Sequence, residues 1–98
     1  MLKKDKIRGS EQIKVTFVLP ADHPHIHASV MGTFNEWNPS ANKLVKRNNG
    51  TYSTAVNLDP GGRYEFRYFA TDGTWFNDEA ADGYEPGEYG SDNCIVET

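Results

Sequence analysis

The sequence contains a single cysteine, Cys94, so the chain cannot form an internal disulfide. This is usual for proteins of a reducing compartment, and we expect a cytoplasmic protein. No apolar run approaches the roughly 20 residues that a membrane-spanning helix needs. The opening segment, MLKKDKIRGSEQ, has lysines but lacks the apolar stretch that follows them in a secretory signal. These absences predict a soluble protein with no membrane partner.

Positive charge is also scarce. The chain has 10 lysine and arginine residues against 14 aspartate and glutamate residues, which gives a formal net charge of −4. A protein that binds nucleic-acid phosphates usually carries a basic stripe, whereas here acidic residues gather toward the C-terminus. We therefore expect no nucleic-acid partner.

No segment has the apolar period of a long helix. Instead, apolar and polar residues alternate over short segments that are separated by turn residues, which predicts an antiparallel β-sandwich of about seven strands. The length of 98 residues corresponds to one domain. The expected strands cover residues 13–19, 28–32, 43–47, 51–58, 63–70, 74–76 and 93–98.

The remaining segments are expected to lack regular structure. Residues 1–12 show no periodicity and are predicted to be a flexible N-terminal lead-in, so that the domain covers residues 13–98. Residues 77–92 combine glycine, proline and acidic residues, which predicts an irregular, solvated loop. The pair Asn49–Gly50 predicts a hairpin with a type I′ turn.

Aromatic residues make up 12% of the chain, and its two tryptophans, Trp37 and Trp75, lie at strand–loop boundaries. Each could close one end of the core, because tryptophan is highly buried on average. Phe34 is already available, however, to anchor the turn that contains Trp37. A flat indole among polar side chains can instead stack on the apolar face of a sugar ring. Both interpretations stay open for each tryptophan on these residues alone.

The segment RYEFRYFA, residues 63–70, separates its side chains by alternation. The uncharged set, which includes Phe66 and Tyr68, should face the core. Arg67 should then point outward, and for a lone residue of this kind we expect a solvated side chain whose stem lies on the sheet.

Other reactive residue types give weaker signals. His23, His25 and His27 have the spacing to bind zinc, copper or nickel from an extended chain, but Pro24 and the loop composition favour a solvated loop. The acidic residues of segment 77–92 do not match an EF-hand, and a domain this small can hardly enclose the paired carboxylates of a glycosidase. Cys94 is expected to be a small core residue. We expect no metal, no cofactor and no catalytic residues.

Three segments taken together resemble a known family: VMGTFNEWNP, GTYSTAVNLDPGGRYEFRYFATDGTWFND and YGSDNCIV. They are similar to the family-48 carbohydrate-binding modules, also called isoamylase N-terminal or early-set domains, over about residues 13–97. The same module is the glycogen-binding domain of the AMP-activated protein kinase β subunit, and it precedes the catalytic barrel of branching and debranching enzymes. The resemblance implies an immunoglobulin-like, early-set β-sandwich.

The resemblance also implies a sugar site. Trp37 and Trp75 would stack on glucose units. Arg67 would contact hydroxyl groups, and Asn93 would hydrogen-bond the sugar. Tyr89 would insert into the curve of the glucan. The chain departs from the kinase-type pattern in having Arg67 in place of a lysine and one more residue in the turn FATDG before Trp75.

The expected function is therefore non-catalytic binding of α-glucans such as glycogen, starch or malto-oligosaccharides, with a glucan-metabolising enzyme as a second partner in trans. An alternative is a protein-interaction or scaffold domain that has lost sugar binding and packs against a glycoside hydrolase. A third hypothesis, an enzyme, is disfavoured by the size of the domain and by the lack of a carboxylate cleft.

Overall fold

The computed structural model describes residues 2–87 and 90–98. This part of the chain consists of β-strands and one short 3₁₀ helix, and it contains no helix long and apolar enough to cross a membrane. In chain order the elements are β1 (Leu2–Lys6), β2 (Ile13–Leu19), β3 (Ala28–Gly32), η1 (Thr33–Asn35), β4 (Val45–Lys46), β5 (Tyr52–Leu58), β6 (Arg63–Ala70), β7 (Trp75–Phe76), β8 (Gly83–Pro86) and β9 (Asp92–Glu97).

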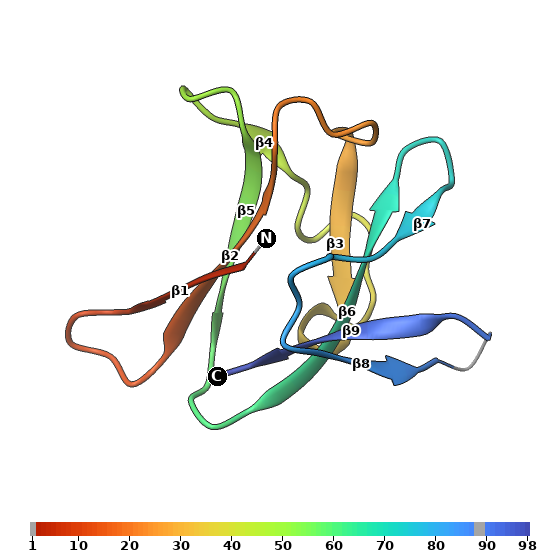
Figure 1. The fold of residues 1–98 in the computed structure, drawn as a ribbon. Helices are drawn as coiled ribbons and strands as arrows, with labels where there is room; N and C mark the ends of the chain where they lie inside the picture. Colours follow the sequence, from red (N-terminus) through yellow and green to blue (C-terminus); the bar gives the residue numbers. More distant parts are fainter. Residues whose placement is uncertain (1, 88–89) are drawn as a thin grey trace.

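The strands form two antiparallel sheets that enclose one core (Figure 1). The first sheet has the order β1-β2-β5-β4. The second has the order β3-β6-β9-β8, and the short strand β7 pairs with β6. This arrangement is the predicted immunoglobulin-like sandwich, with seven strands where the sequence predicted them and two more, β1 and β8.

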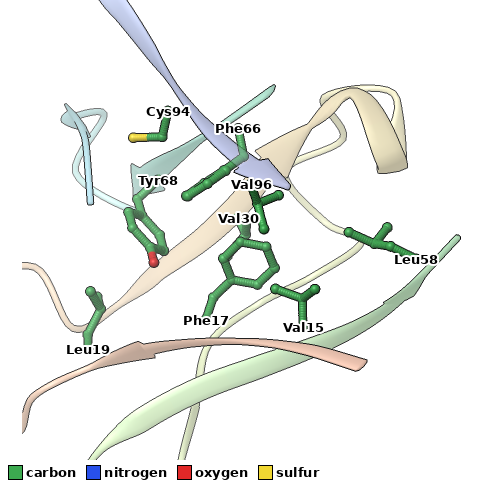
Figure 2. Packing of buried hydrophobic residues seen from close by; sticks show 9 residues of the cluster. All are labelled: Val15, Phe17, Leu19, Val30, Leu58, Phe66, Tyr68, Cys94 and Val96. Atoms are coloured by element: carbon green, nitrogen blue, oxygen red, sulfur yellow. The ribbon is translucent and has the colours of Figure 1, made fainter. Parts of the chain in front are cut away.

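Alternation along the central strands builds the core. On β2, Val15, Phe17 and Leu19 are buried, and on β6 the same holds for Phe66 and Tyr68. Figure 2 shows side chains of the two sheets meeting, and the rings of Phe17 and Phe66 pack edge to face with 4.9 Å between centroids. Each buried side chain of this kind contributes about 1.5–3 kcal/mol of transfer free energy. Because β6 buries alternate residues, its remaining residues, Arg67 among them, face away from the core as predicted.

The strand β1 lies where the sequence analysis expects a flexible lead-in. Its residues pair with β2 in continuous register, from Leu2 opposite Phe17 to Lys6 opposite Ile13. The side chains after Leu2 are exposed, so the strand is held mainly by its backbone hydrogen bonds to β2. Because it buries no alternate side chains, its sequence shows no apolar alternation. Lysines on such an edge strand also discourage pairing with another chain.

The strand β8 corrects the expectation of an irregular loop over residues 77–92. It pairs with β9, from Gly83 opposite Ile95 to Pro86 opposite Asp92, and it forms one edge of the second sheet. Glycine and proline argue against a central strand but are compatible with an edge strand that pairs on one side.

The turn between β4 and β5 also differs from the prediction of type I′. Gly50 donates from its backbone N–H to the carbonyl of Arg47 over 3.0 Å, so the closed turn runs from Arg47 to Gly50. Among the described residues Gly50 has φ of 86°, whereas Asn49 is not one of those with positive φ. A type I′ turn needs positive φ at both central residues. Here the positive φ falls on Gly50, the last residue of the turn, as in hairpins with a three-residue loop.

Candidate functional site

A groove lies on the face of the second sheet that points away from the core. With a volume of about 1010 Å³ it can hold a small ligand. Among the described residues, its lining is formed by Thr33, Trp37, Glu65, Arg67, Trp75, Pro86, Gly87, Ser91 and Asn93. Four of the five residues predicted as a sugar site therefore lie in one groove. The fifth, Tyr89, lies outside the described residues.

Trp37 reaches the groove through a tight turn after β3. Its backbone N–H donates to the carbonyl of Gly32 over 2.9 Å. Glu36 and Trp37 both have positive φ, 56° and 58°, which is uncommon for residues other than glycine. Phe34 of the same turn packs on Phe17 with 5.7 Å between ring centroids. As predicted, Phe34 anchors the turn in the core, and Trp37 is left half-buried beside the groove.

Two further residues hold this turn. The side-chain oxygen of Asn35 accepts from the backbone N–H of Gly32 over 3.0 Å, and its Nδ2 donates to the carbonyl of Val30 over 2.9 Å. A Cβ atom at Gly32 would lie 2.5 Å from the carbonyl oxygen of Glu65 and 2.7 Å from the Phe34 ring. Gly32 is therefore required for the close approach of the turn to β6.

Trp75 enters the groove from β7, where it pairs with Phe69 of β6. The two rings lie 4.7 Å apart between centroids. The guanidinium carbon of Arg67 lies 5.6 Å from the centroid of the Trp75 ring, a cation–π distance. Trp75 still has 43% of its surface exposed, so these contacts orient the indole and leave much of it open to a ligand.

Asn77 contacts the groove residue Arg67, and the sequence analysis did not identify it. Its Oδ1 accepts from Nε of Arg67 over 2.7 Å, and its Nδ2 donates to the carbonyl of Asp92 over 2.9 Å. It thereby connects β6 with the start of β9, next to Asn93. The signal was present: Asn77 follows Trp75 by two residues, so an extended chain places both side chains on one face.

Glu65 is a second such residue. It lines the groove, and its Oε1 accepts from Nδ2 of Asn93 over 3.3 Å. The alternation of β6 places Glu65 on the same outward face as Arg67, which the sequence indicated, but its position in the groove depends on the neighbouring strand β9.

Asp78 corrects the expectation that the acidic residues of segment 77–92 are solvated. Asp78 is only 4% exposed, and its carboxylate accepts from the hydroxyl of Tyr68 over 2.7 Å and from the N–H of Ala80 over 2.8 Å. Burial raises the pKa of the Tyr68 phenol, and the Asp78 charge raises it further. The hydroxyl of Tyr84 donates to the Asp78 carbonyl over 2.5 Å. These contacts fix the segment that carries Trp75 and Asn77.

The Asp78 backbone also contacts Cys94, which is fully buried as predicted. The N–H of Asp78 donates to Sγ over 3.2 Å. Burial raises the pKa of the Cys94 thiol to about 11. The thiol is therefore a neutral core group.

The three histidines do not converge on a common point. His23 and His25 lie against Phe76, with ring centroids 4.9 Å and 5.4 Å away, whereas His27 contacts Tyr52. Burial lowers the pKa of His23, and the neighbouring His25 lowers it further. Within residues 2–87 and 90–98, no three His, Cys, Asp or Glu side chains lie close enough together to hold a metal ion.

Comparison with known proteins identifies the family of this chain. The chain matches the family model of Carbohydrate-binding module 48 (Isoamylase N-terminal domain) over residues 9–84. It is 36% identical over 84 residues to an amylopullulanase of Thermoanaerobacter thermohydrosulfuricus, and 36% identical over 83 residues to one of Thermoanaerobacterium thermosulfurigenes. Each match covers 82% of this chain but 5% and 4% of the respective relative. The chain therefore belongs to carbohydrate-binding module family 48, the isoamylase N-terminal domain family.

Proposed function

We propose that this module binds α-glucans, such as glycogen, starch or malto-oligosaccharides, in the groove on the second sheet. The observation that carries the proposal is that Trp37 and Trp75, from separate turns of the chain, line one groove with polar side chains. A glucose ring has an apolar face of C–H groups and a rim of hydroxyls, and this lining matches both. The relatives are named amylopullulanases, which supports an α-glucan over other sugars.

Each proposed site residue has a distinct role. Trp37 and Trp75 stack on glucose rings. The guanidinium of Arg67 donates to sugar hydroxyls, and Asn93 forms a further hydrogen bond. Tyr89, by the family resemblance, inserts into the curve of the glucan. By analogy with aromatic pairs, each stacking contact contributes about 1 kcal/mol beyond burial. The expected dissociation constant lies in the range of about micromolar to millimolar.

The test is an NMR titration of the isotope-labelled protein with maltoheptaose, in which the two indole N–H signals are followed. We expect both signals to move in a saturable manner. Cellohexaose, whose β-linkages hold successive rings in a straight chain, is the control ligand and should shift them much less. Trp37→Ala should weaken maltoheptaose binding strongly. If neither indole signal moves at millimolar maltoheptaose, the proposed function is wrong.

Binding without catalysis is part of the proposal. The family is a binding module, so we expect no release of reducing sugar when the protein is incubated with starch. Release of reducing sugar by the purified chain would contradict this.

A second candidate function is a scaffold domain that packs on a glucan-metabolising enzyme without binding sugar. It is supported by the observation that the matched segment is 5% or less of each relative, so that the module there has neighbours. A stable complex with such an enzyme, together with no maltoheptaose shift, would favour this candidate.

A further inference from the structure

Glu65 is a carboxylate of the groove that forms no ion pair within the described part of the chain. The side chain is half-buried on β6 and lines the groove beside Asn93. Among the described residues, no lysine, arginine or histidine forms an ion pair with it. A partly buried carboxylate loses hydration, and this costs free energy unless hydrogen bonds replace the lost water.

The described residues supply only part of the hydrogen bonds that would replace the lost hydration of the Glu65 carboxylate. In the described part of the chain, the side-chain hydrogen bond to Glu65 is the one from Nδ2 of Asn93, and at 3.3 Å it is long. An ionised carboxylate can accept about four hydrogen bonds through its two oxygens. The described residues therefore leave most of the acceptor capacity of Glu65 to a ligand.

We propose that Glu65 is a direct ligand-binding residue whose carboxylate accepts hydrogen bonds from glucose hydroxyls; this rests on the proposed function of the groove. Glu65 and Arg67 alternate on β6 and share its outward face. One is an acceptor only and the other a donor only. Adjacent hydroxyls of a pyranose complement such a pair, because one hydroxyl accepts from the guanidinium while the next donates to the carboxylate.

The guanidinium is already oriented for this role. Its Nε donates to Asn77, and its carbon lies 5.6 Å from the centroid of the Trp75 ring. No residue among 2–87 and 90–98 accepts a hydrogen bond from the Nη groups of Arg67, so these groups can donate to a sugar hydroxyl. Hydrogen bonds to ionised groups are roughly twice as strong as neutral ones, so the pair gives the groove a polar contact that an amide in place of the carboxylate cannot equal.

Glu65 could instead serve only to hold Asn93, and the variant Glu65→Gln separates the two roles. A glutamine keeps one oxygen that can accept from Asn93, so a merely structural Glu65 is replaced without loss. A direct contact with the ligand would be weakened, because the amide exchanges one acceptor oxygen for a donor and removes the charge.

The experiment measures maltoheptaose affinity by isothermal titration calorimetry for the wild type, Glu65→Gln, Glu65→Ala and the control Glu97→Gln, which changes an exposed carboxylate on β9. We expect Glu65→Gln to weaken binding about tenfold, Glu65→Ala at least as much, and the control to bind as the wild type does. Backbone amide spectra verify that each variant is folded.

Wild-type affinity in Glu65→Gln would overturn the inference and leave the proposed function intact. Absence of binding by the wild type at millimolar maltoheptaose would overturn both. A loss in Glu97→Gln equal to that in Glu65→Gln would show a general charge effect and would also overturn the direct contact.

Discussion

Glu36 and Trp37 hold positive φ in succession, and neither is glycine. Such a backbone costs on the order of 1 kcal/mol or more per residue, and it persists only where the surroundings impose it. Here Asn35 binds the backbone of Val30 and Gly32 before the turn, and its Nδ2 donates to Oδ1 of Asn42 after it. Phe34 of the same turn packs against the core. The turn thus holds Trp37 at the groove at the expense of local stability.

This strain predicts a difference between two variants of Trp37. Trp37→Ala and Trp37→Gly both remove the indole and should abolish detectable stacking on maltoheptaose. Glycine adopts positive φ without the Cβ clash, so Trp37→Gly should exceed Trp37→Ala in free energy of unfolding by about 1 kcal/mol. Urea denaturation measures this difference. An alanine variant as stable as the glycine variant would mean that the turn is not strained.

Asn77 is expected to act through Arg67. Removing its amide leaves the guanidinium free to rotate, so Asn77→Ala should weaken maltoheptaose binding severalfold through lost orientation. In an Arg67→Ala background the same substitution should add little, because the oriented group is gone. Calorimetry on the four proteins of this double-mutant cycle gives the coupling. Additive losses would show that Asn77 contacts the sugar independently. The matched control is Asn57→Ala, which changes an exposed residue of β5 in the other sheet.

At the scale of elements, β1 belongs to the first sheet, whereas the groove lies on the second. Deleting residues 1–8 removes the β1–β2 hydrogen bonds and the packing of Leu2 on the core. We expect the free energy of unfolding to fall by about 1–3 kcal/mol while the maltoheptaose affinity of the folded protein stays unchanged. Chemical denaturation and calorimetry test the two parts. Loss of affinity in a folded truncated protein would show that β1 shapes the groove.

The strands β6 and β9 bury two groups that ionise at alkaline pH, Tyr68 and Cys94. The pKa of the Cys94 thiol rises from 9.0 to about 11, so between these values the unfolded chain loses a proton that the folded chain keeps. Stability is therefore complete below pH 9 and falls as pH rises, by up to about 1.4 kcal/mol per pH unit. The pKa of Tyr68 is raised too, which adds the same trend above 10.

Cys94→Ser tests this dependence, because serine does not ionise in that range and can still accept from the Asp78 N–H. Urea denaturation at pH 8, 9, 10 and 11 should show that the free energy of unfolding falls less steeply with pH in the variant than in the wild type. This comparison of slopes does not depend on the variant's stability at pH 8. Parallel curves would contradict the assignment of the decline to Cys94.

Alternation in the sequence predicted the central strands well. On β2 and β6, burial of every second side chain decides the structure, and burial leaves a pattern. On β1 and β8, pairing of the backbone with a neighbouring strand decides the structure, and such pairing leaves no pattern in the sequence. The family resemblance indicated Trp37, Arg67, Trp75 and Asn93, which lie together in the groove. It did not indicate Glu65 or Asn77, because their positions depend on partners from other strands.

At the scale of the whole molecule, the net charge of −4 should have little influence on a neutral ligand. Stacking and hydrogen bonds to hydroxyls are not screened by salt in the way that exposed ion pairs are. We expect the maltoheptaose dissociation constant to change less than about twofold between about 0.05 and 0.5 M sodium chloride. Calorimetry at several salt concentrations measures it. A steep salt dependence would instead indicate an ionic ligand.

The residues of the groove extend along the chain from Thr33 to Asn93, and no short segment contains them all. The unfolded chain therefore has no such site, and a bound glucan must shift the folding equilibrium toward the native state. At a ligand concentration of 100 times the dissociation constant, this gain is about 2.7 kcal/mol. Abundant polysaccharide would then protect the module from proteolysis, and depletion of the polysaccharide would shorten its lifetime. Under the proposed function, the lifetime of the module would therefore depend on the supply of its polysaccharide.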